Sequence, residues 1–231
     1  MVTLGVDTST MAEGIGLAGK GILLDERNNH IRRTHSERLL SGIQGLLEQA
    51  GIDLTAIDGF AVTCGPGSFT GLRIGMATVQ GLALACGRPV VGFSTLEAMA
   101  YWCTRSWRGW VCPMIDAGRG EVYAGLFRLE EGKVRRVRED TVVCPGAWAD
   151  RLPANEKFLF VGDGAGRYQG LLVERRGMGH RVLPFHPFLG GTAALLGFQK
   201  FSEDSTAGKV ALRPNYIRRP DLGRGSPVGN N

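Results

Sequence analysis

The chain has 231 residues with a formal net charge of +5, and 43% of the residues are hydrophobic and 21% charged. This length and balance are typical of a globular protein with a full core, either one large domain or two small lobes. No uninterrupted apolar run reaches the roughly 18 residues of a membrane span, and no basic segment followed by an apolar one stands at the start. The composition therefore argues against a membrane protein and predicts a cytoplasmic one.

The residues that commonly bind metals are few and lack the usual spacings. The five cysteines include no C-x-x-C pair, and the four histidines form no H-E-x-x-H pattern. We therefore expect no metal site and reduced, mostly buried thiols. The arginines are spread along the chain, which is more typical of a solvated surface than of a nucleic-acid footprint, although a weak tRNA contact stays open.

Three strands are predicted first, over residues 2–7, 14–18 and 22–27, with a turn at 19–21. An amphipathic helix is predicted next, with Thr34 or Ser36 as the candidate N-cap and Gly51 as its end. Its apolar residues recur at helical spacing, and they are Leu39, Leu40, Ile43, Leu46, Leu47 and Ala50.

The string GPGSFTGLRIG, residues 65–75, follows a predicted strand at 59–64 and runs into a predicted helix at 72–86. Glycines allow positive φ, Ser68 or Thr70 can cap the helix, and the amides of a helix start attract anions. The string is therefore either a well-capped turn or a phosphate or partner site. Because the helix is apolar most of the way round, it needs cover from the preceding helix or from another protein.

The second half repeats the order of the first, with strands at 111–116, 121–129 and 133–138. Asp7 and Asp116 both stand where the first strand of a series ends, and glycine pairs follow a later strand at 64–67 and 161–164. This duplication predicts two α/β lobes of the actin, hexokinase and Hsp70 type (ASKHA) with mixed sheets, the second reduced. We expect lobes at 1–105 and 106–219 and a disordered tail at 220–231.

In that architecture the strand-end aspartates and glycine turns surround nucleotide phosphate. The similarity suggests weak nucleotide binding by Asp7, Thr8, Asp116, Gly162 and Gly164. The alternative is that the aspartates only stabilise their turns through hydrogen bonds to the backbone.

Several motifs together resemble the bacterial TsaB (YeaZ) family, which belongs to the tRNA threonylcarbamoyladenosine machinery. They run in order through nearly the whole chain and comprise Asp7–Ser9, His35–Leu40, Gly65–Gly75, Gly81–Ala83, Ser94–Ala98, Ile115–Ala117 with Glu121–Tyr123, Val161–Gly164 and Pro214–Arg218. The resemblance implies a non-catalytic companion of the transferase TsaD, without a cofactor. At the place where TsaD carries two metal-binding histidines, this chain has Thr95 and Met99, which a hard catalytic metal does not favour.

The resemblance further implies that the two helices bind TsaD, with a TsaE-type ATPase in the larger complex and tRNA contacted only indirectly. The expected interface residues are His35, Leu39, Leu40, Ile43, Leu46, Leu72, Arg73, Met76, Val79 and Ala83. A homodimer through the same helices is an open alternative when TsaD is absent. An ATP-dependent ASKHA kinase or phosphotransferase and a metallopeptidase are the competing functions.

Overall fold

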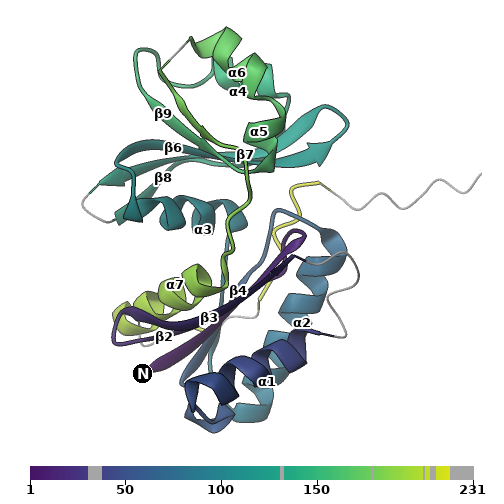
Figure 1. Ribbon diagram of the computed structural model, residues 1–231, viewed down its shortest axis with the longest axis vertical. Coiled ribbons are helices and arrows are strands. Elements are labelled where there is room, and N and C mark those ends of the chain that lie inside the picture. The colour runs from purple at the N-terminus through teal and green to yellow at the C-terminus, as the bar shows by residue number, and fades with distance from the viewer. Residues whose placement is uncertain (31–37, 131–132, 178, 205, 209–211, 219–231) are drawn as a thin grey trace, which may run out of the picture.

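The computed structural model describes residues 1–30, 38–130, 133–177, 179–204, 206–208 and 212–218. Two five-stranded mixed sheets form the centres of two lobes, which lie one above the other in Figure 1. The predicted fold class, two α/β lobes with mixed sheets, is confirmed. The expected His35 contact, both expected helix caps, Thr34 and Ser36, and the tail at 220–231 lie outside the described residues.

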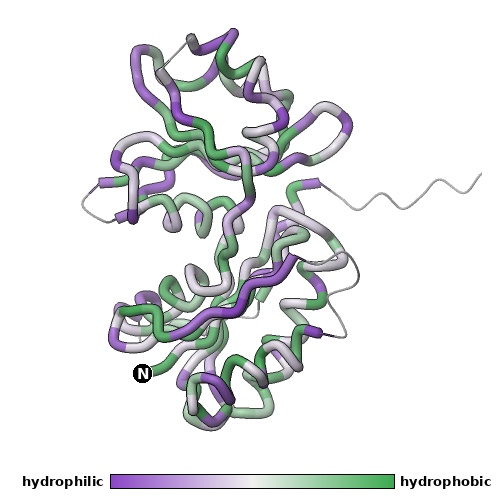
Figure 2. The backbone as a smooth tube through the Cα atoms, viewed as in Figure 1, coloured by the Kyte–Doolittle hydropathy of each residue, from purple (hydrophilic) through white to green (hydrophobic). Residues whose placement is uncertain are grey.

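The first sheet has the strand order β3-β2-β1-β4-β5. Its strands are β1 (Val2–Asp7), β2 (Ala12–Gly19), β3 (Ile22–His30), β4 (Gly59–Thr63) and β5 (Val90–Phe93). β1 pairs antiparallel with β2 and parallel with β4, and all three strands are buried along nearly their whole length, which explains their continuous apolar sequences. β3 is an edge strand, and its polar half is the purple diagonal of Figure 2.

Three helices cover the first sheet. α1 (Leu39–Ala50) and α2 (Phe69–Cys86) lie on one side of it, and α7 (Gly190–Glu203) lies on the other (Figure 1). By length and composition alone α2 could cross a membrane, but one such helix is weak support for a span. Here one side of α2 packs into the core of the lobe through Met76, Val79 and Ala83. A short 3-10 turn, Leu54–Ala56, connects α1 to β4.

The second sheet has the order β10-β9-β6-β7-β8. Its strands are β6 (Gly109–Gly118), β7 (Glu121–Glu130), β8 (Lys133–Val143), β9 (Phe158–Val161) and β10 (Arg181–Leu183). β6 pairs antiparallel with β7 and parallel with β9, as β1 does with β2 and β4. The predicted duplication is therefore present in the strand pairing of both lobes.

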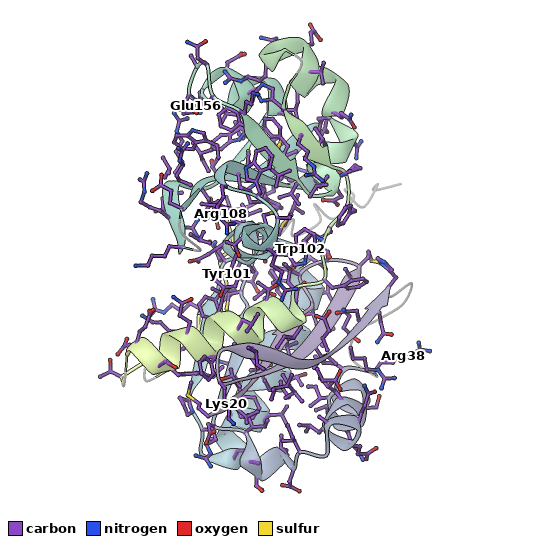
Figure 3. The ribbon with its side chains drawn as sticks, turned by 60° about the vertical axis from the view of Figure 1, so that its left-hand side comes forward. Lys20, Arg38, Tyr101, Trp102, Arg108 and Glu156 are labelled. Atoms are coloured by element: carbon purple, nitrogen blue, oxygen red, sulfur yellow. The ribbon has the colours of Figure 1, made fainter. Side chains whose placement is uncertain are left out.

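The helices of the second lobe are short. They are α3 (Thr95–Trp102), followed by the 3-10 turn Cys103–Arg105, and then α4 (Pro145–Asp150), α5 (Asp163–Arg167) and α6 (Gln169–Arg176). α3 packs on β6, β7 and β8 and also contacts α7 of the first lobe. Figure 3 shows Tyr101 and Trp102 of α3 in this region between the lobes.

Two helices lie in the lobe opposite to the one that the predicted division at residue 105 gives them. α7 follows that boundary in sequence but packs on β1, β2 and β4, whereas α3 precedes it and packs on the second sheet. α7 approaches β2 so closely that glycines are needed at the contact, because a Cβ on Gly16 would lie 2.4 Å from the Cα of Gly191. The first lobe is therefore completed by a helix from the end of the chain.

Candidate functional site

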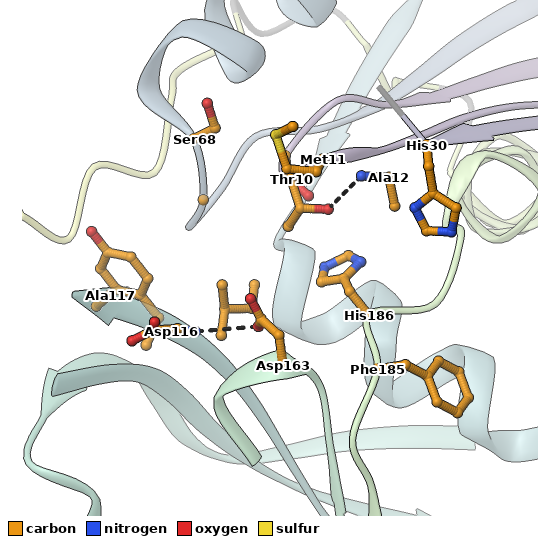
Figure 4. A pocket seen from close by; sticks show the side chains of 14 residues that line it. Thr10, Met11, Ala12, His30, Ser68, Asp116, Ala117, Asp163, Phe185 and His186 are labelled. Carbon is orange, nitrogen blue, oxygen red and sulfur yellow. Dashed lines mark hydrogen bonds between the residues drawn. The ribbon is translucent and has the colours of Figure 1, made fainter. Parts of the chain in front are cut away.

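A cavity of about 500 Å³ lies between the lobes, beside the turns that follow β1 and β6. Figure 4 shows its two walls facing each other. The first lobe contributes side chains that include Ser9, Thr10, Met11, His30 and Ser68. The second lobe and the segment that leads to α7 contribute Asp116, Tyr123, Asp163, Phe185 and His186. This is the part of the structure where the two duplicated halves meet around an open space.

Asp7 ends β1 as expected, but its side chain is sealed from the cavity. The residue is fully buried, and its Oδ1 accepts hydrogen bonds from Thr63 Oγ1 at 2.5 Å and from the Ser9 backbone N–H at 3.1 Å. Thr8 is fully buried too, and its hydroxyl donates to the Gly71 carbonyl at 2.8 Å. The Asp7 side chain therefore ties the end of β1 to β4 and to the turn that follows, and the Thr8 side chain ties that turn to α2.

Asp116, the counterpart of Asp7, does line the cavity. Its Oδ2 lies 2.5 Å from the Arg167 guanidinium, and its Oδ1 accepts from the Gly118 backbone N–H at 3.1 Å. Asp163, at the start of α5, accepts from the backbone N–H groups of Asp116 and Gly164 at 3.2 and 2.9 Å. Two neighbouring carboxylates make this wall acidic, which disfavours a phosphate unless a cation accompanies it.

Gly162 and Gly164 serve the packing of α5 and do not line the cavity. Gly162 has φ +118°, and a Cβ there would lie 2.2 Å from the Met114 carbonyl oxygen. A Cβ on Gly164 would lie 2.9 Å from the carbonyl carbon of Ile115. Of the five residues expected around a nucleotide, Asp116 is the one that reaches the cavity.

The glycine loop at 65–75 holds the turn after β1. The Ser68 backbone N–H donates to the Ser9 carbonyl at 2.6 Å, and a Cβ on Gly67 would lie 2.2 Å from that same oxygen. Ser68 caps α2 by accepting from the Gly71 backbone N–H at 3.2 Å, so the helix begins at Phe69. The loop is thus a capped turn with close packing, and its amides at 68 and 71 already have partners within the chain.

The positions expected for metal-binding histidines are part of the core. Thr95 and Met99 are both fully buried in α3, and Met99 belongs to the core cluster of the second lobe. Within the described ranges, no three His, Cys, Asp or Glu side chains are placed to share a metal ion.

The five cysteines are free thiols, and three of them are buried. Burial raises the pKa of Cys64 to about 11 and the pKa values of Cys103 and Cys112 to about 12. Cys86 is half-buried and Cys144 is exposed. The buried thiols therefore stay protonated and unreactive near neutral pH.

Most residues of the expected partner interface lie in the core of the first lobe. The fractional exposure is 6% or less for Leu39, Ile43, Leu46, Leu72, Met76, Val79 and Ala83. The helix face that is apolar by sequence packs on the sheet, so these side chains do not reach a partner in this conformation. Leu40 is 55% exposed and Arg73 is exposed as well.

The exposed face of α2 carries residues that sequence reasoning missed. Leu84 is 85% exposed, and Ala77, Gly81 and Ala85 on the same helix are exposed too. The sequence signal was present, since the helix is apolar most of the way round. In the cavity, His30 and His186 were missed because no spacing pattern marks them. Tyr123 and Asp163 lie inside family motifs that had been noted, at 121–123 and 161–164, but neither had been assigned to a site.

The fold and the cavity define a class of protein: a two-lobed ASKHA-type α/β chain with duplicated strand-end turns around an interlobe space. A crystal structure of component A of (R)-2-hydroxyglutaryl-CoA dehydratase from Acidaminococcus fermentans has the same fold, with a TM-score of 0.56 and 14% identity over 87% of this chain and 99% of that one. A likeness at this level of identity concerns the fold alone.

Closer similarities give the family. A family model described as TsaD, tRNA N6-adenosine threonylcarbamoyltransferase, matches residues 27–174. The tRNA threonylcarbamoyladenosine biosynthesis protein TsaB of Escherichia coli is 32% identical over 94% of this chain and 95% of its own length. A crystal structure of a protein from Pseudomonas aeruginosa with similarity to YeaZ matches with a TM-score of 0.78 and 33% identity, over 94% of this chain and 99% of that one. The chain belongs to the TsaB (YeaZ) family of tRNA threonylcarbamoyladenosine biosynthesis proteins, within the wider group that the TsaD model matches.

Proposed function

We propose that this chain is a non-catalytic companion subunit that binds and activates the TsaD threonylcarbamoyltransferase. In this role it supports formation of threonylcarbamoyladenosine in tRNA next to the anticodon, in the cytoplasm. A TsaE-type ATPase joins the larger complex, and tRNA is contacted through the other subunits. The observation that carries the proposal is the apolar outer face of α2, on which Leu84 is 85% exposed.

The outer face of α2 has the chemistry of a helix-docking surface. Arg73, Ala77, Gly81 and Leu84 follow one another at steps of three or four residues, so they share one side of the helix. A Cβ on Gly81 would meet nothing within 4 Å, which leaves this side open to another helix. Leu40 of α1 adds a second exposed leucine. We therefore place the contact with TsaD on this exposed surface, and not on the apolar residues of α1 and α2 that are buried in the core of the first lobe.

The interior of the cleft supports a non-catalytic role. Asp7, which the fold would offer as a catalytic or metal-binding carboxylate, is fully buried and bonded to Thr63 and Ser9. A group that acts on a substrate must come within hydrogen-bond reach of it. With Asp7 sealed, the cavity retains the carboxylates of Asp116 and Asp163, and the first of these is engaged by Arg167.

Reconstitution of the modification tests the proposal. TsaD, the TsaE-type ATPase and the enzyme that supplies the threonylcarbamoyl adenylate are combined with tRNA, with and without this chain. We expect modified tRNA to accumulate only when the chain is present. Equal rates without it would show that the companion role is wrong.

Size-exclusion chromatography of the chain alone tests whether α2 pairs with a second copy when TsaD is absent.

The interlobe cavity favours one second candidate, an ATP-dependent phosphotransferase of the ASKHA class. Its volume of about 500 Å³ and its position between the strand-end turns support this candidate, and Asp116 is the expected nucleotide residue that lines it. Titration of the isolated chain with Mg-ATP in a calorimeter tests this function. Tight binding of Mg-ATP followed by its turnover would favour the phosphotransferase over the companion subunit, whereas weak binding without turnover would not.

A further inference from the structure

The segment at residues 212–218, called the strap below, crosses from the first lobe to the second. Figure 1 shows it in yellow, between α2 and the sheet of the second lobe. It comes after α7 in the chain and has no helical or strand structure of its own. Its fixed course therefore depends on the side-chain and backbone contacts that it makes to both lobes.

The strap contacts the glycine loop of the first lobe. The Asn215 backbone N–H donates to the Cys64 carbonyl at 2.7 Å. The Asn215 carbonyl lies over Gly65, where a Cβ would be only 2.9 Å from its oxygen. Gly65 also has φ +110°, so glycine is favoured at this position both by the backbone angle and by the close approach of the strap. The strap thereby fixes the loop that leads into α2.

The strap also holds the first turns of α2 through Tyr216. The Nε of Arg73 donates to the Tyr216 hydroxyl at 3.3 Å, and the rings of Tyr216 and Phe69 lie 4.9 Å apart. The Arg73 guanidinium in turn stacks 3.8 Å from the centre of the Phe69 ring. Phe69 is the first residue of α2 and Arg73 lies one turn further on, so both anchors belong to the start of the helix.

On the other side, Arg218 joins the strap to the second lobe. Its guanidinium donates to the Ala117 carbonyl at 2.8 Å and pairs with the carboxylate of Glu121. These two residues flank the turn between β6 and β7, directly after the cavity residue Asp116.

Asn215 makes a second connection to that lobe through Asp140 of β8. The Asn215 side-chain amide lies 3.4 Å from the Asp140 carboxylate, which also accepts from Ser94 and Arg136. The Asp140 side chain is only 5% exposed, so this junction lies inside the protein. Within seven residues, the strap therefore bonds to the loop before α2, to α2 itself and to three strands of the second lobe, β6, β7 and β8.

We propose that the strap is a positioning element, which holds the first turn of α2 in the orientation that TsaD binds and couples that orientation to the second lobe through Arg218. The inference rests on the proposed function, because it concerns the same helix surface. Helix ends fray when nothing holds them, and a surface that must be ordered during docking binds more weakly than one ordered in advance. The strap supplies that order to a helix start that follows glycines at 65 and 67, both with positive φ.

Two substitutions test the strap, with a matched control. Arg218→Gln removes the guanidinium that reaches the second lobe, and Tyr216→Phe removes the hydroxyl that Arg73 uses but keeps the ring. Arg128→Gln is the control, because Arg128 also makes an ion pair in the second lobe and its side chain is 28% exposed against 23% for Arg218. The measurements are affinity for TsaD and hydrogen exchange of the amides in the first and last turns of α2, each on the full chain.

We expect Arg218→Gln to weaken TsaD binding about tenfold, which corresponds to about 1.4 kcal/mol. Exchange should quicken in the first turn of α2 and stay unchanged in the last turn. Tyr216→Phe should act in the same direction, and Arg128→Gln should change neither measurement.

The other outcomes refute either the positioning role of the strap alone or the proposed function together with it. Unchanged TsaD affinity in both strap variants, with the wild-type chain binding, refutes the positioning role and leaves the companion function intact. Faster exchange throughout both lobes reduces the strap to a general stabilising contact and also refutes the positioning role. If the wild-type chain does not bind TsaD at all, the proposed function fails, and the positioning role fails with it.

Discussion

Truncating one buried and one exposed side chain of α2 distinguishes the side of the helix that packs in the core from the side proposed to meet TsaD. Met76 is 6% exposed and packs in the first-lobe core, whereas Leu84 is 85% exposed. Met76→Ala should lower the free energy of unfolding by about 2–5 kcal/mol, as buried large-to-small substitutions do. Leu84→Ala should change it by no more than about 0.5 kcal/mol, because the side chain has few contacts to lose.

For TsaD binding the order of the two effects is reversed. Leu84→Ala removes three carbon atoms, worth together about 2.4 kcal/mol if fully buried at about 0.8 kcal/mol each. Since 85% of the residue is exposed in the free chain, complete cover by TsaD corresponds to at most about 2 kcal/mol, or roughly 25-fold in Kd. Met76→Ala protein that remains folded should bind nearly as well as wild type.

The assay combines urea unfolding with a titration of TsaD against each variant under conditions where the variant is folded. Leu24→Ala provides a matched control, because Leu24 is also an exposed leucine of the first lobe but lies on the edge strand β3. A Kd for Leu84→Ala within twofold of wild type would refute the assignment of this face to TsaD. An equal loss of affinity in the Leu24 control would refute it as well.

Two further predictions concern packing and pH. Gly16→Ala should destabilise the chain by about 1–3 kcal/mol in urea unfolding, because the new Cβ would lie 2.4 Å from the Gly191 Cα, and Gly81→Ala, with nothing within 4 Å, should stabilise α2 by about 0.5–1 kcal/mol. A neutral Gly16→Ala would show that α7 does not pack closely on β2. Because the thiols of Cys64, Cys103 and Cys112 have pKa values of about 11, 12 and 12 when folded and 9.0 when unfolded, stability should fall as the pH rises from 9 towards 11. Urea titrations at pH 8, 9 and 10 measure this, and replacement of Cys112 by Ala, which removes one such thiol, should make the loss smaller; a loss of the same size would assign it to other groups.

The sequence by itself determined the class of fold and the family. The alternation of strand patterns and turn glycines recurs in both halves of the sequence. The structure bears out this repeat, since β1 and β6 each pair with the next strand and with a later parallel one. The turn role of the glycine loop was one of two alternatives in the sequence, and a local hydrogen bond from Gly71 to Ser68 is consistent with it. Such features depend on residues that are near one another in the chain.

Only the tertiary structure decided which residues face a partner, a cavity or the core. Met76 and Leu84 are both apolar residues of α2. Met76 is buried because it packs in the core of the first lobe, whereas Leu84 is exposed because it lies on a side of the helix that does not face that core. Asp7 and Asp116 hold equivalent places in the duplicated pattern, yet Thr63 seals the first and the cavity exposes the second. Likewise, α7 and the strap return to the first lobe through contacts with β1, β2 and the glycine loop. These outcomes depend on pairs of residues far apart in the chain, which no local pattern records.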